Sequence, residues 1–240
     1  MGESDMKGCL CIHGFTGAPF EVEPLVRHLK EETDWMIKAP TLPGHGDVPS
    51  LKGIQFTQWI AHAENELRDL MNECEEVYII GFSMGGLIAA YLASEYQVEK
   101  LVLLSAAAYY LNPRQMLLDV KELITDTIRG NGANSEIYIR YRKKVLETPL
   151  AAALEFRKLV RYIRPILDKI TIPVLIVQGE CDGIVPIKSA QYLYERIPSD
   201  QKELCFLPCS KHLVCHGEDF PMLIDVIESF LITQDRMSLK

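Results

Sequence analysis

The chain has 240 residues, a length within the range of a single α/β domain. Apolar residues make up 48% and charged residues 24% of it, which is typical of a globular protein with enough apolar side chains for a sizeable core. The net charge of −8 argues against general nucleic-acid binding, because such binding needs clustered cations to neutralise phosphates.

The first residues carry no targeting pattern. Met1–Met6 lacks the positive region and the following apolar run of a signal peptide. The longest apolar stretch, Leu101–Leu111, is too short to span a bilayer. We therefore expect a cytoplasmic location without stable membrane anchoring.

The first third of the chain alternates short apolar runs with helical patterns. Lys7–Ile12 is predicted to be a fully buried strand, which enters a glycine loop at His13–Gly17. Pro24 suits the first turn of a helix that ends near Glu32. Trp35–Ala39 is predicted as a second strand, followed by a loop.

The next segment repeats this alternation. Apolar residues recur at helical spacing from Phe56 to Met71, and predict an amphipathic helix. Val77–Ile80 and Lys100–Ser105 are predicted strands, with a helix at Gly86–Ala93 between them. Each strand is apolar throughout rather than at alternate positions, which indicates a parallel sheet covered on both faces.

A strand-to-helix turn lies at the centre of this region. Gly81–Gly85 has the pattern G-x-S-x-G, in which strand and helix backbones nearly touch and glycine avoids a clash. We expect Ser83 to be pushed out of this turn and exposed. A serine hydroxyl is a weak nucleophile, so the pattern has a chemical meaning only with a neighbouring base and with donors for an oxyanion. The alternative for the motif by itself is a chance match in a glycine-containing loop.

The alternation stops between residues 108 and 165. Three helical stretches follow one another: Arg114–Ile128, Ser135–Leu146 and Leu150–Ile163. We interpret residues 108–165 as a helical cap inserted into a core of residues 1–107 and 166–240. Residues 113–165 contain eleven Lys and Arg and six Asp and Glu. This basic segment is either a solvated helix surface or a lid that steers anionic ligands.

The alternation then resumes to the end of the chain. The predicted elements are two strands and two helices: Pro173–Val177, Ile187–Arg196, Glu203–Leu207 and Asp219–Leu231. In a parallel sheet, all carboxyl ends of strands share one edge, where ligands bind. His13–Phe15, Ser83, Asp182 and His212 each follow a predicted strand, so we expect them to converge at this edge.

Cysteine usage favours reduced thiols. The chain has seven cysteines, an odd number, without the framework of a small disulfide-rich domain. One cluster contains zinc-ligand types: Cys205, Cys209, His212, Cys215 and His216. Its spacings match no zinc finger or ribbon, which favours the alternative of buried thiols around a site that uses His212 for another purpose.

Taken together, the motifs resemble those of the α/β hydrolases of the bacterial carboxylesterase and monoacylglycerol lipase group. The resemblance covers nearly the whole chain and rests on five motifs: His13–Gly17, Pro43–Gly46, Gly81–Gly86, Asp182–Pro186 and His212. The order Ser, Asp, His along the chain is that of this superfamily. The resemblance implies the α/β-hydrolase fold, a mostly parallel doubly wound sheet with a helical cap inserted between strands.

The resemblance also implies roles for the residues at the strand ends. Ser83 is expected to be the nucleophile, His212 the general base, and Asp182 the residue that orients the imidazole. The backbone N–H groups of Phe15 and Met84 are expected to form the oxyanion hole. No metal or organic cofactor is implied.

Two of these assignments have rivals. His216 is an alternative to His212, but the distance from the preceding strand favours His212. Glu180 is an alternative to Asp182, but the D-G-x-V-P context favours Asp182. Relatives commonly have a small residue before the catalytic histidine, whereas Lys211 stands there in this chain. We expect this ammonium group to change the pH dependence of the reaction or to contact the leaving group.

The expected function is a serine hydrolase that cleaves carboxylic esters, with short to medium acyl chains or monoacylglycerols as substrates. Apolar side chains of the cap are expected to form the acyl pocket: Met116, Leu117, Leu118, Ile124, Ile137, Tyr138, Tyr141 and Leu154. Alternatives are a thioesterase, a lactonase or another acyl hydrolase that uses the same residues. A further alternative is a non-catalytic protein of the same fold that binds a small ligand.

Overall fold

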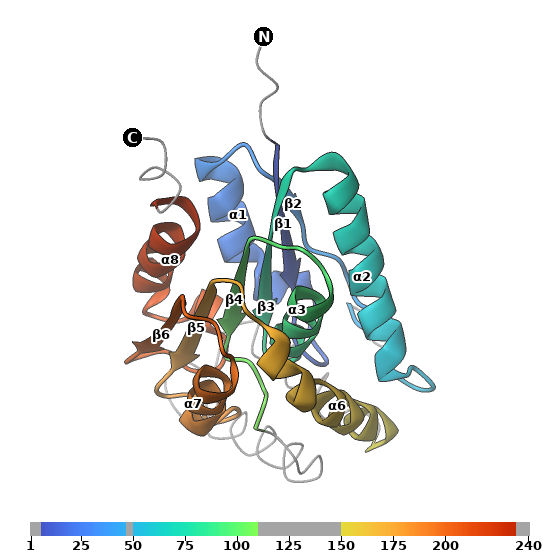
Figure 1. Ribbon diagram of the computed structural model, residues 1–240. Coiled ribbons are helices and arrows are strands. Elements are labelled where there is room, and N and C mark those ends of the chain that lie inside the picture. The colour runs from blue at the N-terminus through green and yellow to red at the C-terminus, as the bar shows by residue number, and fades with distance from the viewer. Residues whose placement is uncertain (1–5, 47–49, 110–149, 234–240) are drawn as a thin grey trace.

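The computed structural model describes residues 6–46, 50–109 and 150–233 (Figure 1). Its strands form one sheet in the order β2-β1-β3-β4-β5-β6, and all neighbouring strands are parallel. Their bounds are β1 Lys7–Ile12, β2 Met36–Lys38, β3 Glu76–Phe82, β4 Lys100–Leu104, β5 Val174–Gly179 and β6 Lys202–Leu207. The chain therefore runs outward from β1 to β2 and then crosses back to β3 on the other side of β1.

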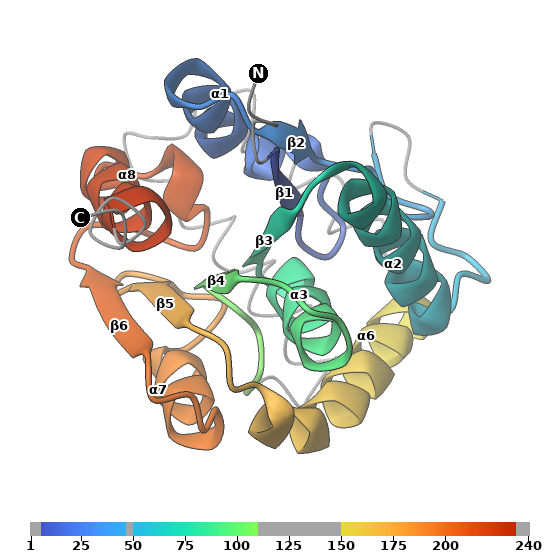
Figure 2. The ribbon, with the colours of Figure 1, turned by 45° about the horizontal axis from the view of Figure 1, so that its top comes forward.

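Helices cover both faces of the sheet. On one face lie α2 (Phe56–Glu73), α3 (Met84–Glu95), α6 (Leu150–Ile163) and α7 (Ile187–Arg196), and on the other lie α1 (Glu23–Glu32) and α8 (Phe220–Glu228) (Figure 2). The shorter helices are η1 Pro19–Glu21, η2 Arg164–Lys169, η3 Val214–His216 and η4 Ser229–Thr233.

Each central strand contributes to two separate cores. In β4, Leu101 and Leu103 face the core under α2, α3 and α6, whereas Val102 and Leu104 face the core under α1 and α8. All four side chains are 0% exposed. Both faces of the strand are buried, which explains why its sequence is apolar at every position.

The predicted alternation of strands and helices is confirmed. The main difference is at the C-terminus, where Asp219–Leu231 was expected to be one helix. The structure instead ends α8 at Glu228 and continues with a π-helical turn at Ser229–Thr233. The short 3-10 helices were not predicted, because a stretch of three to six residues carries too little periodicity to detect.

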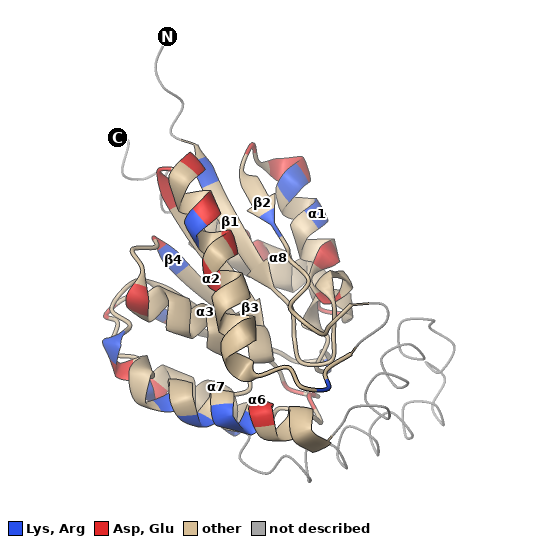
Figure 3. Ribbon diagram, turned by 90° about the vertical axis from the view of Figure 1, so that its right-hand side faces the viewer, with Lys and Arg blue, Asp and Glu red and all other residues tan. Residues whose placement is uncertain are grey.

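Part of the predicted cap lies outside the described residues. This applies to the two stretches Arg114–Ile128 and Ser135–Leu146, whereas the third prediction, Leu150–Ile163, matches α6. Helix α6 packs against α3 and α2. Its outer side carries Lys and Arg residues (Figure 3), so the basic character read from the sequence continues into the described part of this segment.

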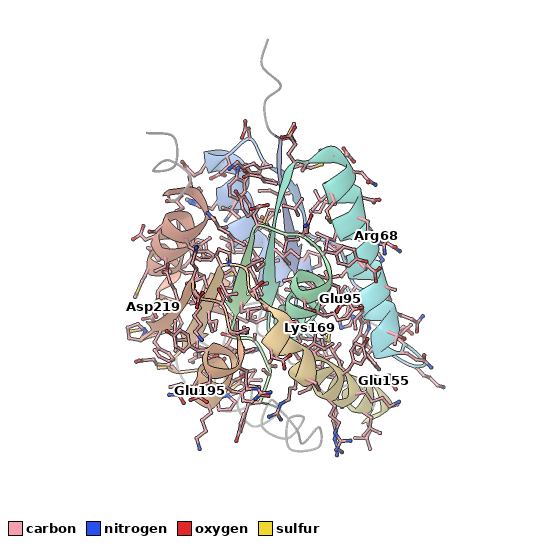
Figure 4. All side chains as sticks on the ribbon, viewed as in Figure 1. Arg68, Glu95, Glu155, Lys169, Glu195 and Asp219 are labelled. Atoms are coloured by element: carbon pink, nitrogen blue, oxygen red, sulfur yellow. The ribbon has the colours of Figure 1, made fainter. Side chains whose placement is uncertain are left out.

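Exposed ion pairs occur both between elements and within one helix. Lys169 of η2 lies 3.4 Å from Glu95 at the end of α3 (both labelled in Figure 4). Arg68 on α2 pairs with Glu64 one turn earlier at 2.8 Å. These exposed pairs contribute little to stability, so the apolar cores hold the helices on the sheet.

None of the helices in the described ranges combines the length and the apolar character that a membrane-spanning helix needs.

The end of the last helix is held by a buried cation. Lys100, at the start of β4, donates hydrogen bonds from Nζ to the carbonyl oxygens of Phe230 at 3.2 Å and Leu231 at 3.1 Å. Its residue is 7% exposed. A cation at a helix C-terminus satisfies carbonyls that lack a partner within the helix.

Replacement of this cation is expected to loosen the C-terminal turn. Lys100→Met should lower the free energy of unfolding by about 2 kcal/mol, because charge-assisted hydrogen bonds to two carbonyls are lost. For a chain of this size, this corresponds to a fall in melting temperature of roughly 4–8 °C. Thermal unfolding followed by circular dichroism measures it, with Lys188→Met on the exposed side of α7 as the control. Equal melting temperatures for the two variants would contradict a stabilising role for Lys100.

Candidate active site

The order of the strands defines where a ligand binds. The chain leaves β1 in one direction and returns to β3 in the other, so the sheet has its topological switch point between these two strands. Ligands of open α/β sheets bind outside the carboxyl ends of the strands at such a point. His13 follows β1 and Ser83 follows β3, which places both of them there.

The turn that carries Ser83 is sterically constrained. Ser83 has φ 54° and ψ −113°, an unfavourable region for a residue with a side chain. A Cβ atom on Gly85 would meet the carbonyl oxygens of Ile12 and His13, and one on Gly81 would meet the carbonyl oxygen of Gly85. The two glycines therefore let the turn press against the end of β1.

The expectation of an exposed Ser83 is wrong. The residue is only 7% exposed, and the imidazole of His212 lies against its hydroxyl. The ring of Phe82 in turn lies beside that of His212, with the ring centroids 4.9 Å apart. The turn thus directs the serine side chain toward the histidine rather than into open solvent.

Ser83, His212 and Asp182 form one hydrogen-bonded chain. The hydroxyl Oγ of Ser83 lies 3.1 Å from Nε2 of His212, and Nδ1 of His212 lies 2.8 Å from Oδ2 of Asp182. The side chains of His212 and Asp182 are 4% and 0% exposed. Since a carboxylate only accepts, Nδ1 carries the proton and Nε2 is free to accept from the serine.

The carboxylate of Asp182 is fixed by the backbone that follows it. Its Oδ1 accepts hydrogen bonds from the N–H groups of Ile184 at 2.8 Å and Val185 at 2.9 Å. This arrangement gives the D-G-x-V-P segment after β5 a physical meaning. The turn bends back so that two of its N–H groups donate to the side chain of its first residue, Asp182.

The rivals of these residues have other partners. Nε2 of His216 donates to the carbonyl oxygen of Phe20, at 2.8 Å, and so His216 is bonded to Phe20 and not to Asp182. Glu180 is exposed at the end of β5. Among the described residues, the geometry therefore joins His212 and Asp182 to Ser83 and leaves His216 and Glu180 outside.

The loop that carries His212 is pinned from the start of α8. Asp219, labelled in Figure 4, accepts hydrogen bonds at Oδ2 from the N–H of Cys209 at 2.7 Å and from the hydroxyl of Ser210 at 2.8 Å. The carbonyl of Ser210 then accepts from the N–H of Cys181, at 3.1 Å. The histidine loop and the aspartate loop are thus connected through Ser210.

Two backbone N–H groups belong to residues that follow strands at the same edge. Met84 is the first residue of α3, and Phe15 lies in the loop after β1. Within the part of the chain that the structure describes, no hydrogen bond occupies the N–H group of either residue. Such N–H groups at a helix start and a neighbouring loop are suited to an oxyanion.

The loop after β1 is held by two buried polar side chains. Oε2 of Glu21, a residue 1% exposed, accepts a hydrogen bond from the N–H of Gly14 at 2.7 Å. His13 accepts at Nε2 from the N–H of Leu42, at 3.0 Å, and donates from Nδ1 to the carbonyl oxygen of Gly14, at 2.8 Å. His13 is therefore neutral, and it joins this loop to the one after β2.

Aromatic rings surround the same loop. The ring of Phe15 stacks on that of Phe156 from α6, with centroids 5.2 Å apart and an interplanar angle of 11°. Trp59 contacts Phe15 edge-on at 5.8 Å and donates from Nε1 to the carbonyl oxygen of Pro43. Helix α6 thus packs directly on the loop after β1.

Comparison with known proteins agrees with this geometry. Residues 5–219 match the family described as serine aminopeptidase, S33. The chain belongs to this family. It is 29% identical over 228 residues to a thermostable monoacylglycerol lipase of a Bacillus species, an alignment that covers 93% of this chain and 89% of the relative.

Other relatives extend the same picture. A carboxylesterase of Bacillus subtilis is 24% identical over 227 residues, which cover 94% of this chain and 92% of the relative. A metagenome-derived lipolytic enzyme of the LipS and LipT pair superposes with a TM-score of 0.77 at 22% identity and covers 94% of this chain and 93% of its own. The protein is therefore a hydrolase of the esterase and lipase type with the α/β-hydrolase fold.

Of the predicted acyl-pocket residues, Leu154 is described and is 43% exposed, and the other seven lie outside the described residues. All seven cysteines are described, and none forms a disulfide. In the described ranges, no group of three His, Cys, Asp or Glu residues is arranged to hold a metal ion.

Sequence reasoning missed several residues that shape this site. They are Glu21, Phe156, Gln178 and Asp219. Helical spacing places Phe156 on the buried face of α6, but it does not reveal the ring that it contacts. A usable signal existed for Gln178, because it is a polar residue inside an apolar strand.

Loss of the Glu21 carboxylate is expected to destabilise the loop after β1. Glu21→Ala should lower the free energy of unfolding by about 1–3 kcal/mol, because the buried N–H of Gly14 loses its acceptor. Glu21→Gln should lie closer to wild type, since the amide oxygen can still accept. Urea unfolding measures both variants, and Glu23→Ala on the exposed side of α1 is the control. An alanine variant as stable as the control would contradict this role of Glu21.

Proposed function

We propose that this protein is a serine esterase that cleaves carboxylic esters through an acyl-serine intermediate, with Ser83, His212 and Asp182 as its catalytic residues. The observation that carries this proposal is the hydrogen-bonded chain from Ser83 Oγ through His212 to Asp182. It lies beside two N–H groups, of Phe15 and Met84, that no described residue occupies. Nucleophile, base and oxyanion donors thus occur at one sheet edge.

The chain's own groups account for both halves of the reaction. Oγ of Ser83 attacks the ester carbonyl carbon while its proton moves to Nε2 of His212, and the N–H groups of Phe15 and Met84 stabilise the resulting oxyanion. The tetrahedral intermediate then expels the alcohol, which takes the proton from Nε2. Asp182 stabilises the imidazolium throughout.

A water molecule completes the cycle. His212 takes a proton from the water as its oxygen attacks the acyl carbon, and a second tetrahedral intermediate forms at the same oxyanion donors. Its collapse breaks the bond to Oγ, and the proton returns from Nε2 to Ser83. The products are a carboxylic acid and an alcohol, and no metal or organic cofactor enters any step.

The proposed substrates are esters of short to medium acyl chains or monoacylglycerols. Two observations support this class. The relatives named above are a monoacylglycerol lipase and a carboxylesterase. The surroundings of the oxyanion loop are also apolar and aromatic, with Phe15 and Phe156 stacked on each other. An acyl chain is the part of an ester that gains most from such surroundings.

We further propose that residues 108–165 form a cap over the core of residues 1–107 and 166–240. The packing of α6 against α2 and α3, together with its contact from Phe156 to Phe15, supports this division. A cap in this position would let the length of the acyl chain influence the geometry of the oxyanion loop.

Removal of the nucleophile is expected to abolish ester hydrolysis. On a series of p-nitrophenyl esters of increasing acyl length, wild type should show a rate maximum at one length, and Ser83→Ala should lower kcat by roughly 10⁶-fold. Labelling with a fluorophosphonate should modify wild type and not the variant. A wild type that neither hydrolyses the esters nor reacts with the probe would favour a ligand-binding protein of the same fold.

The two neighbouring histidines provide a matched comparison. His212→Ala should lower kcat by several orders of magnitude, because Ser83 loses the base that takes its proton. His216→Ala removes a histidine of the same loop region whose Nε2 is bonded to the carbonyl of Phe20. It should lower the melting temperature while kcat stays within about threefold of wild type. A loss of kcat as large in His216→Ala as in His212→Ala would contradict the assignment of the base.

A further inference from the structure

The second-last residue of β5 is an unusual polar residue in the core. Gln178 follows Val174–Val177, four apolar residues, and its residue is 0% exposed. Glutamine is seldom fully buried, because its amide group must find partners for two N–H bonds and one oxygen. Its environment therefore calls for a physical explanation.

The amide nitrogen of Gln178 lies among three acceptors. Nε2 donates to Oδ2 of Asp182 at 2.9 Å and lies 3.3 Å from the carbonyl oxygens of both Gly179 and Val185. The opposite orientation of the amide would place its oxygen against a carboxylate and two carbonyls. The surroundings therefore fix which end of the amide faces Asp182.

In this orientation, the amide oxygen of Gln178 is left without a hydrogen bond from the described residues. Oε1 of Gln178 is buried and has no hydrogen-bond partner among the described residues. A buried polar atom without a partner reduces stability, whereas an apolar side chain like those of the preceding residues would avoid this cost. The donor on Nε2 is the compensating feature, and its strongest acceptor is the Asp182 carboxylate.

We infer that Gln178 is a positioning residue for the proposed hydrolysis, acting through Asp182. Oδ2 of Asp182 accepts from Nδ1 of His212 and from Nε2 of Gln178, while Oδ1 accepts from the N–H groups of Ile184 and Val185. Each oxygen is thus held by two donors. This inference rests on the proposed function, because it concerns the same site.

The second donor on Oδ2 restricts rotation of the carboxylate. Without it, the carboxylate stays anchored at Oδ1 by the N–H groups of Ile184 and Val185, but Oδ2 is held only by the histidine that it orients, so Oδ2 and the imidazole can shift together about that anchor. The bond of 3.1 Å between His212 and Ser83 depends on the orientation of that ring. Misplacement of a catalytic group by about 1 Å can reduce a rate on the order of a hundredfold.

The first test replaces the donor with an apolar side chain. Gln178→Leu should lower kcat by roughly ten- to a hundredfold. Its KM should stay within about twofold of wild type, since Gln178 is placed against Asp182 and not against substrate. The rate of fluorophosphonate labelling of Ser83 should fall in parallel. The control is Gln191→Leu, on the exposed side of α7, which should leave kcat unchanged.

The second test uses an isosteric change with a pH-dependent donor. In Gln178→Glu, the introduced carboxyl group faces Asp182, and two carboxyl groups this close share a proton. While the introduced group holds that proton, its O–H donates to Asp182 as the amide does. Loss of the proton at higher pH leaves two carboxylates that repel each other, with His212 the only other titratable group bonded to Asp182 among the described residues.

The ratio of kcat in Gln178→Glu to kcat in wild type should therefore be highest at acid pH and fall as pH rises. A structural role alone would lower this ratio to a similar extent at every pH. Circular dichroism and melting temperature establish that each variant is folded at each pH used.

The outcomes separate this inference from the proposed function. If wild type hydrolyses esters and labels, but Gln178→Leu matches it in kcat or the ratio for Gln178→Glu does not change with pH, the role of Gln178 is refuted and the esterase proposal stands. If wild type neither hydrolyses nor labels, both proposals fail. A folded Gln178→Leu with reduced kcat, an unchanged KM and slow labelling, together with a ratio that falls with pH in Gln178→Glu, supports the inference.

Discussion

The close contact between the end of β1, the turn after β3 and the start of α3 is the constraint on which the rest of this structure depends. The turn after β3 approaches the end of β1 so closely that a side chain on Gly85 would meet the carbonyl oxygens of Ile12 and His13. This contact brings the start of α3 next to the loop after β1, and with it the N–H groups of Met84 and Phe15. Strain at Ser83, with φ 54°, is sustained because two parallel strands and the packed helix α3 fix the backbone on both sides.

Side chains outside the chain of Ser83, His212 and Asp182 hold the remaining parts of the site. Glu21 and His13 brace the loop after β1, Asp219 braces the histidine loop, and Ser210 connects that loop to the one that carries Asp182. The braces of Glu21 and His13 are hydrogen bonds between a buried side chain and a backbone N–H group. Such bonds are worth more in a water-excluded environment than at the surface, and their loss leaves a buried donor without an acceptor.

The sequence predicts the sheet and the meeting of the three proposed catalytic residues at its edge because both follow from local patterns. Fully apolar runs identify strands buried on both faces, and the carboxyl ends of parallel strands must share an edge, so Ser83, Asp182 and His212 converge without any long-range information. The exposure of Ser83 was mispredicted because it depends on a ring 129 positions away in the chain. Phe156 could not be assigned for the same reason, since its partner Phe15 is set by the packing of elements. Glu21 bonds to Gly14, only seven positions away, but this contact depends on how the glycine loop folds.

The contact between Phe15 and Phe156 connects the loop of the proposed oxyanion donor to the segment proposed to hold the acyl chain. Phe15 is a proposed donor of a backbone N–H group to the oxyanion, while its ring packs against α6, the described part of the segment proposed to be a cap. A displacement of α6 by a ligand therefore acts on the same residue that is proposed to stabilise the transition state. Because interactions accelerate a reaction only when they strengthen in the transition state, this stacking raises kcat only where it improves the placement of the Phe15 N–H group in the transition state. In the proposed reaction, the aromatic contact gives the acyl group of the substrate a physical means to change the rate.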